Sequence, residues 1–282
     1  MLIFNILRNN IKKLIEHLNM YKLSVGAMFK NEATILKEWT EHYLYHGVEH
    51  FYLINDSSTD NFLDVLQPYI DKGQVTLFTT NWDYYNGRQH DMYNAFILPK
   101  IKETKWLLMV DLDEYLWSPQ GINLNTVLDI CGDLAQIQFF DVLFGSNGHI
   151  EQPASVVKGF TMRQFNPRCH LKYFVNSDFE FSSLTVHHAF TVDPKHMEEK
   201  FFTRLGHNYF ILNHYSCLSK QYWLDNKCVR GDSDNYRVRT LDDFNKLDVN
   251  EIQDLRLCEQ NNSIEFYKDA PMENKTLDPK RN

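Results

Sequence analysis

The sequence WLLMVDLDEYL, residues 106–116, decides how this chain is expected to fold, because its apolar run ends abruptly in acids. Residues 106–110 have the length and the β-branched and aromatic content of a short strand buried on both faces. Asp111 and Asp113 stand where that strand would leave its sheet, and open α/β sheets bind ligands beyond such strand ends. In an extended backbone, residues two positions apart point to the same side, so the two carboxylates converge.

The converging acids indicate a bound cation. Two carboxylates in one place repel each other unless a cation lies between them. Mg²⁺ and Mn²⁺ prefer oxygen ligands of this kind and usually complete their coordination with substrate phosphates. The alternative is a turn with solvated acids, which is the usual interpretation of an isolated Asp-x-Asp. The buried strand before the acids and the apolar residues 115–117 after them favour a site for a metal and a phosphate.

Length and composition limit the class of protein. At 282 residues, with 43% hydrophobic residues and few glycines and prolines, the chain has enough apolar side chains for one large domain. Its net charge of −8 argues against a nucleic-acid partner, because nucleic-acid binders normally present a basic face. An acidic site that recruits a metal can still bind a phosphorylated substrate, since the ion inverts the local field.

The cysteines indicate the compartment. They are scattered, odd in number and without C-x-x-C spacing, so we interpret them as free thiols in a reducing compartment. No apolar run is long enough to cross a bilayer, and we therefore expect a soluble cytoplasmic protein. The five cysteines are Cys131, Cys169, Cys217, Cys228 and Cys258.

Three parts are expected along the chain. Residues 1–21 have apolar side chains at helical spacing, which predicts an amphipathic helix. Packing on the body of the protein is the favoured role of this helix, and a peripheral membrane contact is the alternative. Residues 22–257 form the main domain, and the polar residues 258–282 are expected to be a loosely held tail.

The order of the expected elements predicts the fold class. Strands and helices alternate in the first part of the chain, which is typical of a parallel sheet with right-handed crossovers. We therefore expect an α/β fold with a mostly parallel, Rossmann-like central sheet flanked by helices. The alternation consists of strands at 23–29, 48–54 and 74–78 and helices at 33–46 and 62–70. Later we expect strands at 135–140 and 210–212 and helices at 91–102 and 219–226.

Polar residues later in the chain are further candidates for the site. His214 follows the expected strand at 210–212 as Asp111 follows its own strand. Lys227 and Arg230 are three residues apart and could hold a diphosphate from one helix face, or form a solvated basic patch. Arg88 could clamp a phosphate or cap the sheet edge.

The region 158–191 shows no firm hydrophobic period. It contains His170, His187 and His188, and we favour a structural role for them because a lone histidine is more often structural than a ligand.

Taken together, these motifs resemble a glycosyltransferase of the GT-A fold, nearest in pattern to family 2-like enzymes and the family 92 group. The resemblance spans roughly residues 23–257, and its specificity lies in the joint order of motifs that are weak alone. The signatures are Lys30-Asn31-Glu32, Glu38-Trp39 with His42, Gly47-Val48, the loop NDSSTD at 55–60, DLDE at 111–114, FGSNGH at 144–149, and Asn213-His214-Tyr215 with Ser219, Lys227, Arg230 and Gly231.

The resemblance implies an activity and a cofactor. It implies transfer of a sugar from a nucleotide donor, for which we expect UDP, to a hydroxyl of a glycan or other acceptor with inversion. It implies Mn²⁺ or Mg²⁺, bound directly by Asp113, with Asp111 near the ribose or reaching the ion through water. His214 matches the later histidine that often completes the metal's protein ligands.

The resemblance also implies a nucleotide-sugar site. Asp56 matches the acid that contacts the base, Glu32 lies beside the ribose and base, Arg88 and Gln89 line the nucleotide pocket, and Lys227 and Arg230 could neutralise the departing diphosphate.

The general base is the weakest part of the resemblance. The acceptor hydroxyl must lose its proton, so an inverting enzyme needs a base on the face of the sugar opposite the diphosphate. Family 2 enzymes commonly use a Glu-Asp motif, and no such dipeptide follows Asp113. Asp141 and His149 are the candidates by position, and Asp178 is a further one.

Two alternatives remain open on the sequence. One is a non-catalytic descendant of the fold that binds a nucleotide or glycan, and the other is a metal-dependent nucleotidyltransferase, which also uses paired carboxylates. The 55–60 loop and the late Asn213-His214-Tyr215 favour the glycosyltransferase.

Overall fold

The computed structural model describes residues 20–168, 170–234 and 236–268. Its first part alternates strands and helices as expected and forms parallel pairs β3–β2, β2–β1 and β1–β4. Every residue of β2 is buried, which fits a parallel strand covered on both faces. These elements are β1 (Tyr21–Phe29), α2 (Ala33–Tyr45), β2 (His50–Asp56), α3 (Phe62–Asp71), β3 (Val75–Thr80) and β4 (Thr104–Met109).

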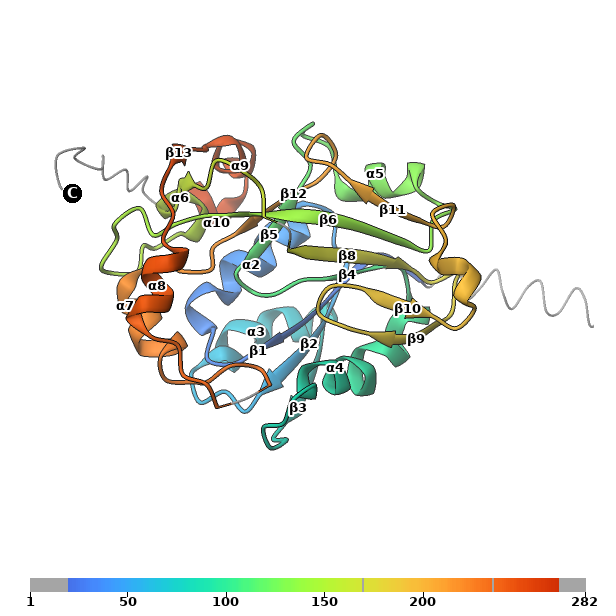
Figure 1. The fold of residues 1–282 in the computed structure, drawn as a ribbon, viewed down its shortest axis with the longest axis horizontal. Coiled ribbons are helices and arrows are strands. Elements are labelled where there is room, and N and C mark those ends of the chain that lie inside the picture. The colour runs from blue at the N-terminus through green and yellow to red at the C-terminus, as the bar shows by residue number, and fades with distance from the viewer. Residues whose placement is uncertain (1–19, 169, 235, 269–282) are drawn as a thin grey trace, which may run out of the picture.

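The second part extends the sheet with strands in mixed directions. The nine-stranded sheet has the order β3-β2-β1-β4-β8-β6-β12-β5, and β11 pairs with β6 off this path (Figure 1). β8 lies antiparallel between β4 and β6, whereas β12 runs parallel to β6. These strands are β5 (Glu114–Trp117), β6 (Gln136–Leu143), β8 (Leu171–Asn176), β11 (Phe202–Leu205) and β12 (Ile211–His214).

The predicted α/β class with a mostly parallel central sheet and flanking helices is therefore confirmed. The remaining helices of the described residues are α4 (Arg88–Met92), η1 (Tyr93–Ile97), η2 (Leu98–Glu103), α5 (Leu124–Ile130), α6 (Val156–Gly159), η3 (Pro194–Met197), α7 (Lys220–Tyr222), η4 (Trp223–Lys227), α8 (Leu241–Leu247), α9 (Arg256–Asn261) and α10 (Glu265–Lys268). The remaining strands are β7 (Met162–Arg163), β9 (Phe181–Leu184), β10 (Ala189–Thr191) and β13 (Ile252–Gln253).

The helix expected at 91–102 is broken into three pieces. It begins as α4, widens to the π-turn η1 and tightens to the 3₁₀ segment η2. Pro99 stands in the first turn of η2, where its missing N–H and its ring prevent an α-helical hydrogen bond. The change of helix type at this proline has a direct steric cause.

Helix α2 anchors the stretch with which the sequence analysis began. The Trp39 indole donates hydrogen bonds to the carbonyl oxygens of Asp111 and Glu114, both at 3.1 Å. The Tyr43 hydroxyl donates to the Glu114 carbonyl at 2.9 Å, and His42 Nε2 lies 2.9 Å from the Leu116 carbonyl. These buried hydrogen bonds fix the backbone beyond β4 and so fix the direction of its acids.

The structure differs from the expected loose tail over residues 258–268. Cys258, Ile264 and Tyr267 are buried in the main core, and α9 contacts α6 (Figure 1). Asn261 accepts from His46 Nε2 at 2.9 Å and donates to His42 Nδ1 at 3.0 Å. The polar composition of this segment concealed a few apolar residues that two short helices turn toward the core.

The rest of the expected tail, 269–282, lies outside the described residues. Residues 1–19 of the expected amphipathic helix lie outside them too. Within the described residues, the structure contains no helix both long enough and apolar enough to cross a membrane.

Candidate active site

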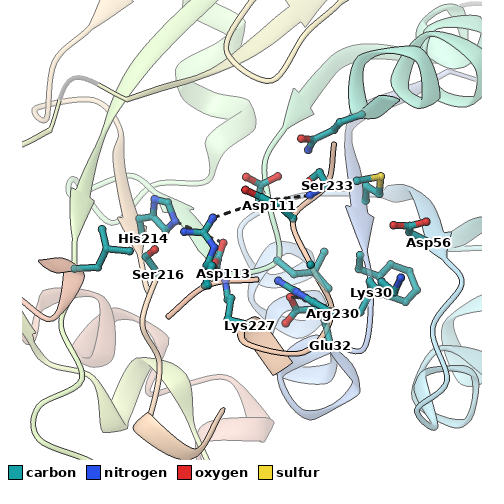
Figure 2. Close-up of a pocket in the computed structure, with 18 of the residues that line it drawn as sticks. Lys30, Glu32, Asp56, Asp111, Asp113, His214, Ser216, Lys227, Arg230 and Ser233 are labelled. Atoms are coloured by element: carbon teal, nitrogen blue, oxygen red, sulfur yellow. Dashed lines mark hydrogen bonds and ion pairs between the residues drawn. The ribbon is translucent and has the colours of Figure 1, made fainter. Parts of the chain in front are cut away.

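A cavity of about 310 Å³ opens at the carboxyl ends of β1, β2, β4 and β12. Its acids and cations converge from segments far apart in the chain (Figure 2). The start of β8 also reaches this edge, because β8 runs antiparallel to β4. Predicted site residues that line the cavity are Glu32, Asp56, Gln89, Asp111, Asp113, His214, Lys227 and Arg230.

The loop at 55–60 holds the exits of β1 and β2 together. Asn31 and Ser57 both have positive φ, 55° and 53°, which lets the chain turn sharply at each strand end. The Asn31 side chain accepts from the Thr59 N–H at 2.7 Å, and Asp60 accepts from the Ala33 N–H at 2.8 Å. Most of this polar motif is therefore structural, and its effect is to place Glu32 and Asp56 at the cavity.

Asp56 forms a buried ion pair with Arg88. Arg88 is 1% exposed and also donates from Nη1 to the Ser233 carbonyl at 2.5 Å. Arg88 was expected in the pocket wall, but it does not line the cavity. Its guanidinium instead binds Asp56, which does line the cavity. Gln89 does line the cavity and donates from its side chain to the Tyr93 hydroxyl at 2.7 Å.

Asp111 pairs with a lysine from the middle of the sheet. Lys172 Nζ lies 2.7 Å from Asp111 Oδ2 and 3.5 Å from Glu114 Oε2, and it is buried. Burial alone would lower the pKa of Lys172, but Asp111 and Glu114 hold that pKa well above its ordinary value. Burial, with the Asp111 charge beside it, raises the pKa of Glu114 to about 7. The acid pair expected from the sequence is thus part of a larger charged cluster.

Asp113 lies between a lysine and a histidine. Its Oδ2 is 2.6 Å from Lys227 Nζ, and its Oδ1 is 3.7 Å from His214 Nε2. Burial would raise the pKa of Asp113, but Lys227 and His214 hold it well below its usual range. This carboxylate is ionised at neutral pH and faces the cavity.

His214 reaches Asp113 because of how β12 ends. β12 pairs with β5 so that His214 lies opposite Glu114, and the Tyr215 N–H donates to the Asp113 carbonyl at 2.8 Å. The other ring nitrogen, Nδ1, lies 2.9 Å from Asp141 Oδ2 and 2.8 Å from Arg168 Nη2. A carboxylate on one imidazole nitrogen directs the other nitrogen toward a ligand.

The structure places Asp141, a predicted candidate base, beside His214 and not in the cavity wall. It is 1% exposed, it does not line the cavity, and Arg168 binds it with Nε at 3.0 Å. Burial would raise the pKa of Asp141, yet its hydrogen bonds with His214 and Arg168 hold the pKa below its usual value. Its position after the expected strand at 135–140 suggested a role in proton transfer, but Asp141 lies within β6 and contacts Arg168 and His214.

The two other candidate bases lie away from the cavity. His149 is buried, with Nε2 3.0 Å from the Gly159 carbonyl, in the loop after β6. Asp178 pairs with Lys105 at the opposite end of β4, since β8 ends there. Neither of these two predicted residues lines the cavity.

Glu32 is held by two partners from the C-terminal part. Arg230 forms an ion pair with Glu32 and donates to the Lys30 carbonyl at 2.6 Å, and the Tyr222 hydroxyl donates to the same carboxylate. Burial raises the pKa of Glu32 against the opposing charges of Arg230 and Lys227.

The sequence alone did not indicate Arg168 or Lys172 as residues of the site, and it favoured a structural role for His170. Arg168 and His170 line the cavity, whereas Lys172 supports it from within the sheet. All three lie in the region without a firm period. A lysine inside the apolar run LKYFVN was the one available signal, because a strand buries such a residue only against an acid.

Asp113 and His214 suit a divalent ion. Ligands of one ion at about 2.1 Å lie roughly 3–4 Å from each other, and the 3.7 Å separation falls in that range. Among the residues that the structure describes, no group of three or more His, Cys, Asp or Glu side chains is arranged to hold a metal. Two protein ligands completed by phosphates and water are typical of Mg²⁺ and of related hard ions.

The class of this protein follows from comparison with known families. The model of a family described as "Glycosyltransferase family 92" matches residues 20–255, which is well over half of the chain. The class is thus that of a glycosyltransferase. The chain belongs to glycosyltransferase family 92, as the motifs had suggested.

Two plant relatives show how much of the family the chain represents. A family 92 protein of Ricinus communis is 21% identical over 69% of this chain and 35% of its own length. One of Oryza sativa subsp. japonica is 24% identical over 69% of this chain and 33% of its own length. The chain spans about a third of the length of these curated relatives.

Solved structures of glycosyltransferases resemble this chain only distantly. S. aureus TarS 1–349 in complex with UDP-GlcNAc is 14% identical, with a TM-score of 0.41 over 86% of this chain and 67% of that one. A mannosyltransferase of Pyrobaculum calidifontis in complex with GDP-Man and Mn²⁺ is 10% identical, with a TM-score of 0.32 over 43% of this chain and 36% of that one. These low TM-scores do not define which residues of this chain correspond to the ligand sites of those proteins.

Proposed function

We propose that this glycosyltransferase moves a sugar from a UDP donor to a hydroxyl of a glycan or similar acceptor, with Mn²⁺ or Mg²⁺ and with inversion. One observation carries the proposal: Asp113 Oδ1 lies 3.7 Å from His214 Nε2 in a cavity that Glu32 and Asp56 also line. Figure 2 shows Asp56 and Lys30 on one side of this cavity and His214 on the other. A nucleotide on the first side would bring its diphosphate toward Asp113.

The cavity can stabilise a departing diphosphate. Breaking the bond between sugar and phosphate leaves negative charge on the leaving group, and charge is stabilised best by groups already in place. A bound divalent ion supplies Lewis-acid stabilisation of that charge. Lys227 and Arg230 line the same cavity and can add two positive charges. Asp56, oriented by Arg88, is left to contact the base.

The acceptor's proton needs a base, and we propose His170 for this role. His170 is an imidazole that lines the cavity just before β8, whereas Asp141, His149 and Asp178 do not line it. Burial and the nearby Arg168 charge hold the pKa of His170 below its ordinary value, so the ring is neutral and able to accept a proton at pH 7.

One observation favours an alternative function. Asp111 and Asp113 are each paired with a lysine, as expected if the chain bound a nucleotide or glycan without catalysis. The nucleotidyltransferase alternative loses its support because the chain belongs to a glycosyltransferase family.

The cytoplasmic location and a membrane contact through residues 1–21 stay predictions.

The test is thermal unfolding with a panel of nucleotides and nucleotide sugars, with and without Mn²⁺. A ligand that binds only the native state raises the melting temperature by mass action. The proposal predicts a rise with UDP and one UDP-sugar that requires Mn²⁺, together with slow hydrolysis of that UDP-sugar. Binding without any hydrolysis would support the non-catalytic alternative, and no shift with any nucleotide would contradict both.

A further inference from the structure

Two lysines neutralise the two acids of the Asp-x-Asp motif, and they are held very differently. Lys172 lies in β8, where it pairs with Phe139 of β6, and the next residue, Tyr173, pairs with Met109 of β4. Lys172 has two carboxylates within 3.5 Å and does not line the cavity. Lys172 is thus a permanent part of the sheet.

Lys227, in contrast to Lys172, lies outside the sheet and, in the part of the chain that the structure describes, has fewer ion-pair partners. It ends the π-turn η4, and the described residues 228–234 and 236–240 that follow form no helix or strand. Its ammonium lines the cavity and, among the described residues, has Asp113 as its one ion-pair partner. Lys227 has a flexible four-carbon stem, so a change of its rotamer can move the ammonium while the Arg230 side chain stays bound to Glu32 and the Lys30 carbonyl.

The ammonium of Lys227 and an ion on Asp113 would compete for the same carboxylate. An ion held between Asp113 and His214 would lie within a few ångströms of a group that is already 2.6 Å from Asp113. Like charges at that separation in a partly buried site repel strongly. Occupation of Asp113 by one cation therefore disfavours the other.

We propose that Lys227 is an internal counter-cation that holds Asp113 until a divalent ion replaces it, and that the released ammonium then contacts the donor's diphosphate. Lys172 remains on Asp111 throughout. This inference rests on the proposed function and adds to it an exchange of partners within the cavity. It explains why a cation suited to binding the diphosphate is found on an acid suited to binding the metal.

The decisive variant is Lys227→Met, which removes the charge and keeps most of the stem. Isothermal titration with MnCl₂ alone should show about tenfold tighter Mn²⁺ binding than in the wild type, because no partner must be displaced. With Mn²⁺ held saturating, the same variant should bind UDP about tenfold more weakly, because a phosphate contact is lost. A purely structural role would weaken both, so the opposite signs identify the exchange.

Lys30→Met is the matched control. Lys30 lines the same cavity, but its ammonium donates to the Tyr84 hydroxyl at 2.9 Å and, within the described part of the chain, forms no ion pair with an acid. This variant removes one charge from the cavity without freeing Asp113, and its Mn²⁺ affinity should stay within about threefold of the wild type. Circular dichroism and melting temperature of both variants establish that they fold.

The results separate this inference from the proposed function. Mn²⁺ binding in Lys227→Met that is equal to or weaker than in the wild type would overturn the exchange. An equal gain in Mn²⁺ affinity in Lys30→Met would also overturn the exchange. The gain would then come from the loss of any positive charge in the cavity and not from the release of Asp113. Wild-type protein that binds neither Mn²⁺ nor UDP would instead overturn the proposed function.

Discussion

Most acids that line the cavity come from the first half of the chain, whereas most of its cations come from the second half. Three ion pairs each join an acid from the first 114 residues to a cation from beyond residue 168. They are Glu32–Arg230, Asp111–Lys172 and Asp113–Lys227. Each acid follows a strand of the first half directly, whereas the cations come from a strand interior, a π-turn and an irregular segment.

This difference shows that neither half forms the site alone. The acids would repel one another without the cations, and the cations are buried only because the acids face them. A cavity that is neutralised from within must also exchange partners when it binds a charged ligand. The predictions below test how far each half depends on the other, from the largest expected effect to the smallest.

Asp113→Asn should have the largest effect. It keeps the shape of the side chain but removes the charge that faces His214 and Lys227. We expect transfer or hydrolysis of the donor to fall by about 10³-fold, because a metal ligand and its charge are lost together. Steady-state rates with Mn²⁺ measure this.

Asp178→Asn is the matched control for that change. It removes the same charge at the other end of β4, beside Lys105, and should leave the rate unchanged. A similar loss in both variants would mean that net charge rather than the cavity controls activity.

Tyr267→Ala tests whether the C-terminal helices support the first half. Tyr267 is fully buried, and its helix follows Asn261, which bonds two histidines of α2. Truncation should lower the free energy of unfolding by about 3 kcal/mol through loss of apolar contacts and the cavity left behind. Urea denaturation measures this, with the neighbouring exposed Lys268→Ala as a control that should change stability by no more than about 0.5 kcal/mol. Equal midpoints for the two variants would restore the expectation of a loose tail.

His170→Gln should slow transfer by about 10²-fold while leaving UDP affinity unchanged, because it removes a base and not a nucleotide contact. Burial and the Arg168 charge hold the pKa of His170 below its ordinary value, so the wild-type rate should be full at pH 7 and fall as pH drops through that pKa. The variant should lack this fall. His187→Gln, whose ring lies 6.1 Å from His170 and outside the cavity wall, serves as a control. A normal pH profile in His170→Gln would assign the base elsewhere.

The sequence predicted what depends on neighbours along the chain. The strand at 106–110 and the acids after it could be recognised because burial and turn chemistry act locally. The conformation of 91–102 was missed because a single proline changes the helix type there. Local patterns also suggested a loose tail from residue 258 onward, because they do not show which apolar residues of that segment pack against the core.

The partners across the cavity could not be predicted in the same way. Lys172 meets Asp111 only because β8 enters the sheet antiparallel beside β4, a choice that depends on the whole topology. Asp141 is predicted as a candidate base because it follows the expected strand at 135–140, and the sequence does not show that Arg168 and His214 both contact it.

The account depends most on metal-dependent donor binding at Asp113. The most direct measurement is isothermal titration of UDP into the wild-type protein with Mn²⁺ and again with EDTA. We predict binding with Mn²⁺ that is at least about tenfold tighter than with EDTA, a difference that disappears in Asp113→Asn. Equal UDP affinity with and without Mn²⁺ would contradict the account, and would leave Lys227 as the permanent cation of the site.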